Sequence, residues 1–155
     1  IPENELSLEA GVTLDGRTRG ADVDEHFQTL REGFFAAGNV LHVHDLVDYV
    51  SLEAEDLANG VKAYLDAGSL PPCTIPLKVD GNINHTVPQR ISGMEDVTVS
   101  MRVNRKLENP TVVFRQGETV IAKRKMKKAI PAEMIRIPLK KENIRGTEAI
   151  EICVE

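Results

Sequence analysis

The spacing of apolar residues predicts one long helix in the first half of the chain. Between residues 45 and 65 apolar side chains recur every three or four positions, and charged residues such as Glu53 fall between them, where we expect them to face water. Asp45 is the expected N-cap, and Asp48 lies in the first turn, near the positive end of the helix dipole. A short helical turn is expected at residues 6–11.

Extended segments are predicted before this helix. Residues 12–16 and 21–24 favour a small surface hairpin around the Asp15-Gly16 turn. Residues 33–38 form an apolar run between glycines, which is typical of a strand buried on both faces of a parallel sheet. That run ends at Gly38 and Asn39, where the backbone can be approached closely and an amide can hydrogen-bond a ligand.

The second half of the chain has the two-residue period of strands. Apolar residues alternate with polar ones over 97–103, and Gln116-Gly117 is a tight-hairpin signal. The expected strands are 74–79, 97–103, 111–115, 119–123, 134–137 and 149–154. We expect an antiparallel immunoglobulin-like β-sandwich, with a small barrel as the alternative. Because the chain has no Trp, the Cys…Trp…Cys core of antibody domains is excluded.

The two patterns meet at Gly68 and the Pro71-Pro72 pair, so we predict two domains, residues 1–68 and 69–155, in an α+β fold. Charge changes at the same place. Residues 1–68 contain four basic and fourteen acidic residues, and 69–155 contain fifteen basic and ten acidic ones. The basic run 123–128 lacks aromatic neighbours for base stacking, so we expect a solvated strand face and no nucleic-acid binding.

Composition narrows the class of protein. The chain has 155 residues, 41% apolar and 28% charged, and no apolar run reaches the roughly 18 residues that a membrane span requires. The N-terminus lacks the pattern of a secretory signal, and we expect a cytoplasmic location. Cys73 and Cys153 stand outside any Cys or His cluster, which favours two buried thiols on strands over a disulfide.

Residues 29–39, TLREGFFAAGN, resemble the second FAD-binding motif of the pyridine nucleotide-disulfide oxidoreductase superfamily, usually written T-x-x-x-G-h-h-A-x-G-D, where h is hydrophobic. Residues 40–50 resemble a bacterial subgroup that is similar to thioredoxin reductase and to the flavoprotein subunits of sarcosine oxidase. Residues 1–6 resemble the stretch after the NAD(P)-binding domain of such proteins. The resemblance covers about residues 1–66, and the usual aspartate of the motif is Asn39 here.

The resemblance implies a fold and a cofactor site. Residues 1–68 would be the C-terminal portion of a Rossmann-like FAD-binding domain. Asn39 would hold a ribityl hydroxyl of FAD, and the first turn of the helix would face the flavin carbonyl. The implied FAD-contacting residues are Gly38, Asn39, Leu41, His42, Val43, Leu46 and Val47.

The resemblance also implies a parent enzyme. The dinucleotide fingerprint G-x-G-x-x-G is absent from the sequence, and so is a starting Met. We therefore expect the C-terminal fragment of an FAD-dependent, NAD(P)-linked oxidoreductase, inactive alone. Its expected partners are the rest of its own chain or a partner subunit, and a second copy in a homodimer. The alternative is a non-catalytic protein–protein interaction module.

The two histidines of His42-Val43-His44 raise the question of a metal site. A His-x-His pair can supply two metal ligands, but metal hydrolases with such a pair need further His or Asp ligands. The other histidines, His26 and His85, stand in unrelated contexts. We therefore predict no metal. Either His42 or His44 could instead act as a proton donor near the flavin, with a hydrogen-bonded loop histidine as the equal alternative.

Overall fold

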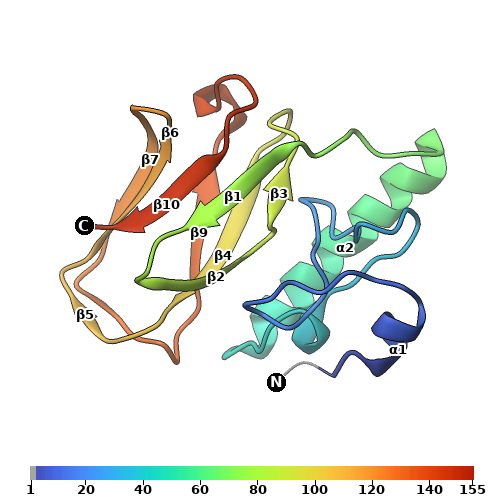
Figure 1. Ribbon diagram of the computed structural model, residues 1–155, viewed down its shortest axis with the longest axis horizontal. Helices are drawn as coiled ribbons and strands as arrows, with labels where there is room; N and C mark the ends of the chain where they lie inside the picture. Colours follow the sequence, from blue (N-terminus) through green and yellow to red (C-terminus); the bar gives the residue numbers. More distant parts are fainter. Residues whose placement is uncertain (1–2) are drawn as a thin grey trace. The chain divides into compact units, whose positions relative to one another are not determined.

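The computed structural model describes residues 3–155 and divides the chain into two compact units, Ile1–Pro72 and Cys73–Glu155. The strands form mainly antiparallel sheets, and one long helix accompanies them, which confirms a mixed α+β class (Figure 1). The division between the units falls directly after Pro71-Pro72. Residues 1 and 2 lie outside the described residues, and they begin the stretch that resembles the segment after an NAD(P)-binding domain.

The first unit contains little regular structure apart from its helices. These are α1, Glu5–Glu9, the 3₁₀ helix η1, Gly38–Val40, and α2, Val47–Ala67. The intervening chain is held by three isolated antiparallel bridges, Leu14↔Ala21, Val23↔Thr29 and Gln28↔Phe35. The expected short helix is confirmed. The expected surface hairpin is reduced to the Leu14↔Ala21 bridge, and its Ala21 is buried.

The prediction of a buried parallel strand at residues 33–38 is wrong. This segment forms only the single antiparallel bridge at Phe35, and Phe34 remains exposed. A strand is stabilised by the ladder of hydrogen bonds to its neighbours, and the described part of the first unit offers this segment no neighbouring strand on either side. The apolar run is therefore extended but irregular.

The long helix is confirmed, but its cap is not the expected one. α2 runs over 21 residues, and its N-cap is Leu46, in an extended conformation and without a side-chain cap hydrogen bond. Asp45 lies one residue too early to be the cap. At the other end Gly68 adopts a left-handed conformation with φ 78° and donates its N–H to the Tyr64 carbonyl at 2.8 Å.

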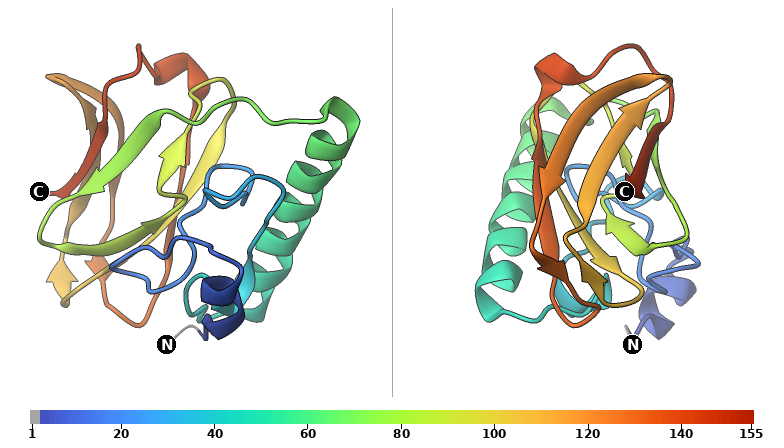
Figure 2. Two further views of the ribbon diagram at one scale, coloured as in Figure 1. Left: turned by 45° about the vertical axis from the view of Figure 1, so that its right-hand side comes forward. Right: turned by 90° about the vertical axis from the view of Figure 1, so that its left-hand side faces the viewer.

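α2 packs on the loops of its own unit through an unusual pair of residues. Glu53 and Gly60 are its only buried residues. Gly60 lies so close to the loop that a Cβ built on it would be 2.4 Å from the backbone oxygen of His26. Further along, Tyr64 contacts Phe35 edge to face, with ring centroids 5.8 Å apart. Figure 2 shows the helix as a continuous rod beside these loops. The helix is therefore held by backbone proximity and polar contacts more than by a buried apolar stripe.

The second unit consists of ten strands arranged in sheets. The five-stranded sheet has the order β3-β1-β10-β6-β7, the three-stranded sheet has the order β2-β4-β9, and β5 pairs with β8. The strands are β1 (Ile75–Val79), β2 (Ile83–Val87), β3 (Arg90–Ile91), β4 (Val97–Val103), β5 (Leu107–Glu108), β6 (Thr111–Gln116), β7 (Thr119–Lys125), β8 (Lys128–Ala129), β9 (Ile135–Leu139) and β10 (Ile150–Val154). A 3₁₀ helix, η2 (Lys141–Asn143), precedes β10.

One hydrophobic core joins both larger sheets. Its fully buried members include Ile75 and Phe114 of the five-stranded sheet and Met101 and Leu139 of the three-stranded sheet. Alternation explains this core, because every second residue of β9 is buried. The inward faces of the two sheets therefore pack against each other as a β-sandwich.

All six expected strands are present, and the Gln116-Gly117 hairpin is confirmed, with Gly117 at φ 57° between β6 and β7. The pairing in this unit is mainly antiparallel, as expected, but β1 and β10 pair in parallel. Four further strands, β2, β3, β5 and β8, were not expected. β2 buries the polar side chains of His85 and Thr86, which hides its alternation, and the other three have only two residues each.

Three further predictions concern the cysteines, the basic run and membrane-spanning helices. Cys73 and Cys153 form no disulfide with each other, as expected, but both are only half-buried, and only Cys153 lies on a strand, because Cys73 precedes β1. The basic run 123–128 is largely exposed and begins on β7, as expected for a solvated strand face. Within residues 3–155, no helix has the length and apolar character needed to cross a membrane.

The close approach at Gly60 gives a stability prediction. In a helix interior Gly→Ala normally stabilises by about 1 kcal/mol, but the added Cβ at Gly60 would meet the His26 backbone oxygen. We expect Gly60→Ala to destabilise the first unit by about 1–3 kcal/mol. Both tyrosines of the chain, Tyr49 and Tyr64, lie in α2, and the chain has no Trp, so tyrosine fluorescence during urea unfolding reports on this unit.

The control is Asn59→Ala, at the exposed neighbouring position of the same helix. We expect this variant to be neutral or slightly more stable. Equal or greater stability of Gly60→Ala than of the unaltered chain would show that α2 does not rest on the His26 loop.

Candidate functional site

A buried carboxylate joins α2 to the loop that precedes it. Glu53 is only 4% exposed although it belongs to a helix with few buried residues. Its Oε1 accepts a hydrogen bond from the backbone N–H of Gly38 at 2.6 Å. The expectation that Glu53 faces water is wrong. Its carboxylate turns inward because the loop supplies donors for both of its oxygens.

Two histidines meet the second oxygen of this carboxylate. The Nε2 atoms of His42 and His44 lie 2.9 Å and 3.1 Å from Glu53 Oε2. An ionised carboxylate can only accept hydrogen bonds, so each imidazole donates through Nε2. The two rings stand edge to face, with centroids 4.5 Å apart. The His-x-His spacing therefore directs both side chains to the same oxygen, and we call His42, His44 and Glu53 the HHE cluster.

Asn39 fixes the orientation of one of these rings. Its Oδ1 accepts the backbone N–H of His44 at 3.2 Å and lies 3.3 Å from the Nδ1 atom of the same histidine. The backbone contact identifies the amide atom as the oxygen, because an N–H needs an acceptor. Both ring nitrogens of His44 thus face oxygen atoms that accept hydrogen bonds.

The cluster keeps Glu53 ionised. Burial by itself would raise the pKa of this carboxyl group, but hydrogen bonds from His42 and His44 and from the Gly38 N–H outweigh it. Together they lower the pKa of Glu53 to about 2. The cluster therefore holds a negative charge in the interior of the first unit at all but very acidic pH.

The residues expected to contact FAD divide into two groups. Gly38, Leu41 and His42 are buried, so they lie beneath the surface that a ligand would contact. The side chains of the other four residues are exposed, and they are Asn39, Val43, Leu46 and Val47. These four residues and the uncapped first turn of α2 form one corner of the first unit, which we call the α2 corner.

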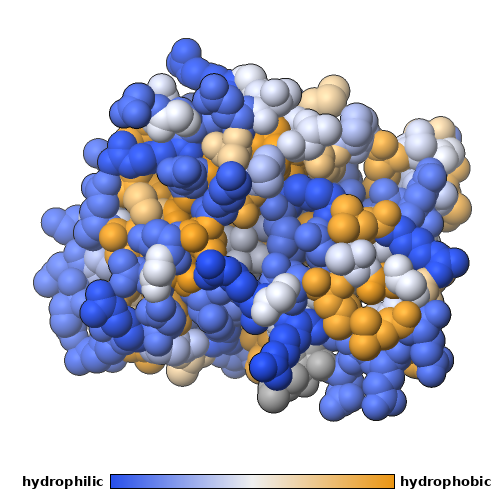
Figure 3. Space-filling model, viewed as in Figure 1, coloured by the Kyte–Doolittle hydropathy of each residue, from blue (hydrophilic) through white to orange (hydrophobic). Residues whose placement is uncertain are grey.

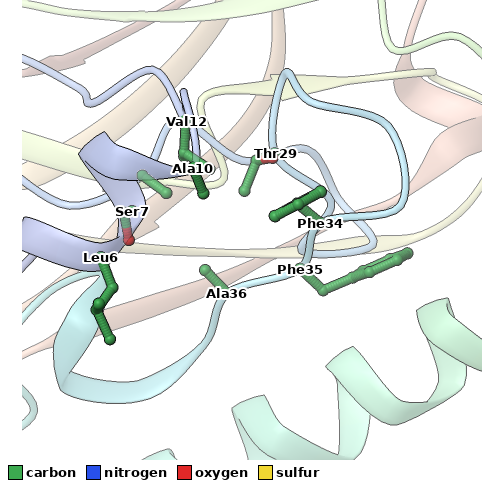
Figure 4. Close-up of a pocket in the computed structure, with 9 residues that line it drawn as sticks. Leu6, Ser7, Ala10, Val12, Thr29, Phe34, Phe35 and Ala36 are labelled. Carbon is green, nitrogen blue, oxygen red and sulfur yellow. The ribbon is translucent and has the colours of Figure 1, made fainter.

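An apolar cavity lies between the region of α1 and residues 29–36. It has a volume of about 210 Å³. Figure 4 shows the side chains of α1 facing those of the irregular segment across it. The lining residues are Leu6, Ser7, Ala10, Val12, Ala21, Thr29, Phe34, Phe35 and Ala36. Figure 3 shows apolar atoms gathered over α1 and the adjoining loops, and Leu6 is 79% exposed.

Sequence reasoning identified the histidine pair but missed the carboxylate that joins it. Glu53 falls on the same helix face as Val50, Leu57 and Tyr64, which are three, four and eleven positions away. A charged residue within this inward-facing apolar stripe was the available signal. Glu53 was not predicted as a neighbour of the histidine pair, because only the other histidines were considered.

Comparison of the chain with protein-family models, with curated proteins and with solved structures found no match. The α2 corner, the HHE cluster and the apolar cavity are therefore the three candidate sites of the first unit.

The HHE cluster gives a prediction about pH. The pKa of Glu53 is about 2 in the folded chain and has an ordinary value of 4.5, so the unfolded state binds more protons between these values. The stabilisation is complete above pH 4.5 and is lost as the pH falls towards 2. We expect stability to fall between pH 5 and pH 2 by about 3 kcal/mol more in the unaltered chain than in Glu53→Gln.

The measurement is urea unfolding followed by tyrosine fluorescence, in the presence of a chelator. As the control, Glu55→Gln removes an exposed carboxylate two positions away on the same helix and should retain the full acid sensitivity. Parallel stability curves for Glu53→Gln and the unaltered chain would contradict the assignment of this charge to the interior.

Proposed function

We propose that this chain supplies the second FAD-binding segment of an FAD-dependent, NAD(P)-linked oxidoreductase. The observation that carries the proposal is the α2 corner, where an exposed amide, exposed apolar side chains and an uncapped helix N-terminus lie together. FAD has a hydroxylated ribityl chain, an apolar ring and polar carbonyl groups, and each of these has a chemical counterpart at the corner. When bound, the flavin would accept and donate the electrons of the reaction.

Asn39 and Gly38 suit the ribityl side of such a ligand. Gly38 has φ 77°, which turns the chain sharply before η1, and the Asn39 side chain emerges from this turn into solvent. Because Asn39 Oδ1 already accepts from His44, the amide offers its NH₂ group to a ligand hydroxyl. The proposal therefore assigns Asn39 the role of donor to the ribityl chain.

The start of α2 suits a carbonyl that becomes negatively charged. No side chain caps the N-terminus of this helix, and Val47 is 80% exposed. The first-turn N–H groups and the helix dipole would stabilise negative charge that develops on the flavin carbonyl during reduction. Val43 and Leu46 would cover the apolar ring, whereas Leu41 and His42 are buried beneath them.

The rest of the first unit suits a segment that packs against more protein. Leu6 and Leu65 are 79% and 73% exposed, and the apolar cavity borders α1. Apolar surface of this kind is typically covered by a partner. We propose that the Rossmann-like part of an FAD domain, on the same chain or on a partner subunit, covers it, and that the immunoglobulin-like sandwich of the second unit is a docking module.

A second candidate function is a non-catalytic interaction module. The same exposed apolar residues and the cavity favour it, because a docking surface needs no cofactor. A second copy of the chain could cover this surface in a homodimer. The two functions differ in one measurable respect, because only the first requires bound flavin.

The test is the flavin content of the purified product of the gene that encodes this sequence. We expect it to contain FAD, identified by chromatography after heat release. Asn39→Leu should lower the FAD content about tenfold at limiting FAD, which corresponds to the loss of about 1.4 kcal/mol of hydrogen bonding.

The control is Asn59→Leu, which makes the same substitution at an exposed position elsewhere on α2 and should leave the FAD content unchanged. A product that contains no flavin and takes up none on titration would refute the oxidoreductase proposal and favour the interaction module. The proposal would also fail if Asn39→Leu bound as much FAD as the unaltered protein.

A further inference from the structure

We propose that the HHE cluster is a binding site for a divalent transition-metal ion of the Zn²⁺ type. The cluster brings together two imidazole nitrogens and one carboxylate oxygen, a donor set that suits such ions. One ring nitrogen each of His42 and His44 and one carboxylate oxygen of Glu53 lie within 4.8 Å of one another. The inference does not depend on the flavin proposal, because all three ligands belong to the folded first unit.

The distances in the cluster are close to those of a metal site. Zn–N and Zn–O bonds of about 2.0–2.1 Å place neighbouring tetrahedral ligand atoms about 3.3 Å apart. The two Nε2 atoms lie 2.9 Å and 3.1 Å from Glu53 Oε2. The nitrogens are at most 4.8 Å apart, so they need to approach each other by no more than about 1.5 Å. A small rotation of the imidazole rings achieves this.

The surrounding contacts hold two of the ligands, His44 and Glu53, as a metal site requires. A metal-bound histidine must offer the lone pair of Nε2 and carry its proton on Nδ1, where a neighbouring acceptor usually holds it. Asn39 Oδ1 lies 3.3 Å from His44 Nδ1 and provides that acceptor. Glu53 is held in the same way, because its second oxygen accepts the Gly38 N–H and leaves Oε2 to the metal.

His44 also gives an independent indication of a ligand. Both of its ring nitrogens face acceptor oxygens, Glu53 Oε2 and Asn39 Oδ1. A neutral imidazole has one proton and can satisfy only one of them. With a metal ion between Nε2 and Glu53, the single proton on Nδ1 satisfies Asn39 and the ion satisfies the carboxylate. The arrangement of acceptors therefore matches the metal-bound form of a neutral ring.

The burial of the site suits a bound ion. Glu53 is 4% exposed and His42 beside it is 2% exposed, so that little water competes for the ligand atoms. The three ligands leave one position of a tetrahedral ion for water or another small ligand. The ion would also connect residues 42 and 44 to α2 and so stabilise the first unit.

The test uses the chain without FAD and Co²⁺ as a spectroscopic substitute for Zn²⁺. We expect one Co²⁺ per chain, with the visible spectrum of a nitrogen and oxygen site and without a sulfur-to-cobalt charge-transfer band. Zn²⁺ should displace Co²⁺ and raise the thermal unfolding midpoint of the first unit, whereas Mg²⁺ should do neither. His44→Asn should lower the Co²⁺ affinity at least about 100-fold, more than outer contacts usually contribute.

Two further variants make the result independent of folding. Asn39→Ala, at an exposed position, removes the contacts of Oδ1 to the Nδ1 and the backbone N–H of His44 and should lower the affinity about tenfold. His85→Asn removes a similarly buried histidine in the second unit and should not change it. Circular dichroism checks that each variant is folded.

The proposal is overturned by a sulfur-to-cobalt band, because Cys73 or Cys153 would then hold the ion. It is also overturned if folded His44→Asn binds Co²⁺ as tightly as the unaltered chain, or if the unaltered chain binds no Co²⁺. A negative result leaves the flavin proposal unaffected, because the FAD content is measured on the gene product with its own control.

Discussion

The first unit depends on one buried carboxylate. Glu53 accepts hydrogen bonds from the Gly38 backbone and from two histidines, and so joins α2 to the turn at η1 and to the following loop. The described part of the unit has no regular strands, so contacts of this kind help to fix the loop against the helix. The position of Asn39 and the start of α2, and with them the α2 corner, follow from this contact.

The way α2 packs also explains the exposed apolar surface. A helix that approaches its neighbour through a glycine and a glutamate needs no wide apolar stripe buried beneath it. Leu65 and Val47 are therefore exposed although they belong to an amphipathic pattern. Exposed apolar surface is unfavourable in water. A partner that covers it therefore gains hydrophobic free energy that the folding of the unit alone does not provide. The proposed flavin domain and the interaction module both make use of this property.

The sequence predicted the features that depend on local periodicity. The long helix, six strands and the Gln116-Gly117 hairpin could be predicted because neighbouring residues determine them. The prediction of a strand at 33–38 is wrong because a strand needs partners that the local sequence does not specify. The parallel pairing of β1 with β10 could not be predicted either, because it joins segments far apart in the chain. At the site the histidine pair was visible, but Glu53 was read as solvent-facing because charge usually indicates exposure.

Glu53 on the inward face of α2 is one member of a set of polar groups that depend on one another. Removing a carboxylate from water costs several kcal/mol, and replacing buried ionic groups by apolar side chains of similar volume is often neutral or stabilising. The neighbouring inward positions, Leu57 and Tyr64, are apolar, so a leucine at position 53 would continue the stripe. An apolar side chain would leave the Gly38 N–H and two histidine rings without their acceptor. The carboxylate and the two histidines therefore stabilise the fold only as a set, and the proposed metal site rests on this set of two imidazoles and one carboxylate.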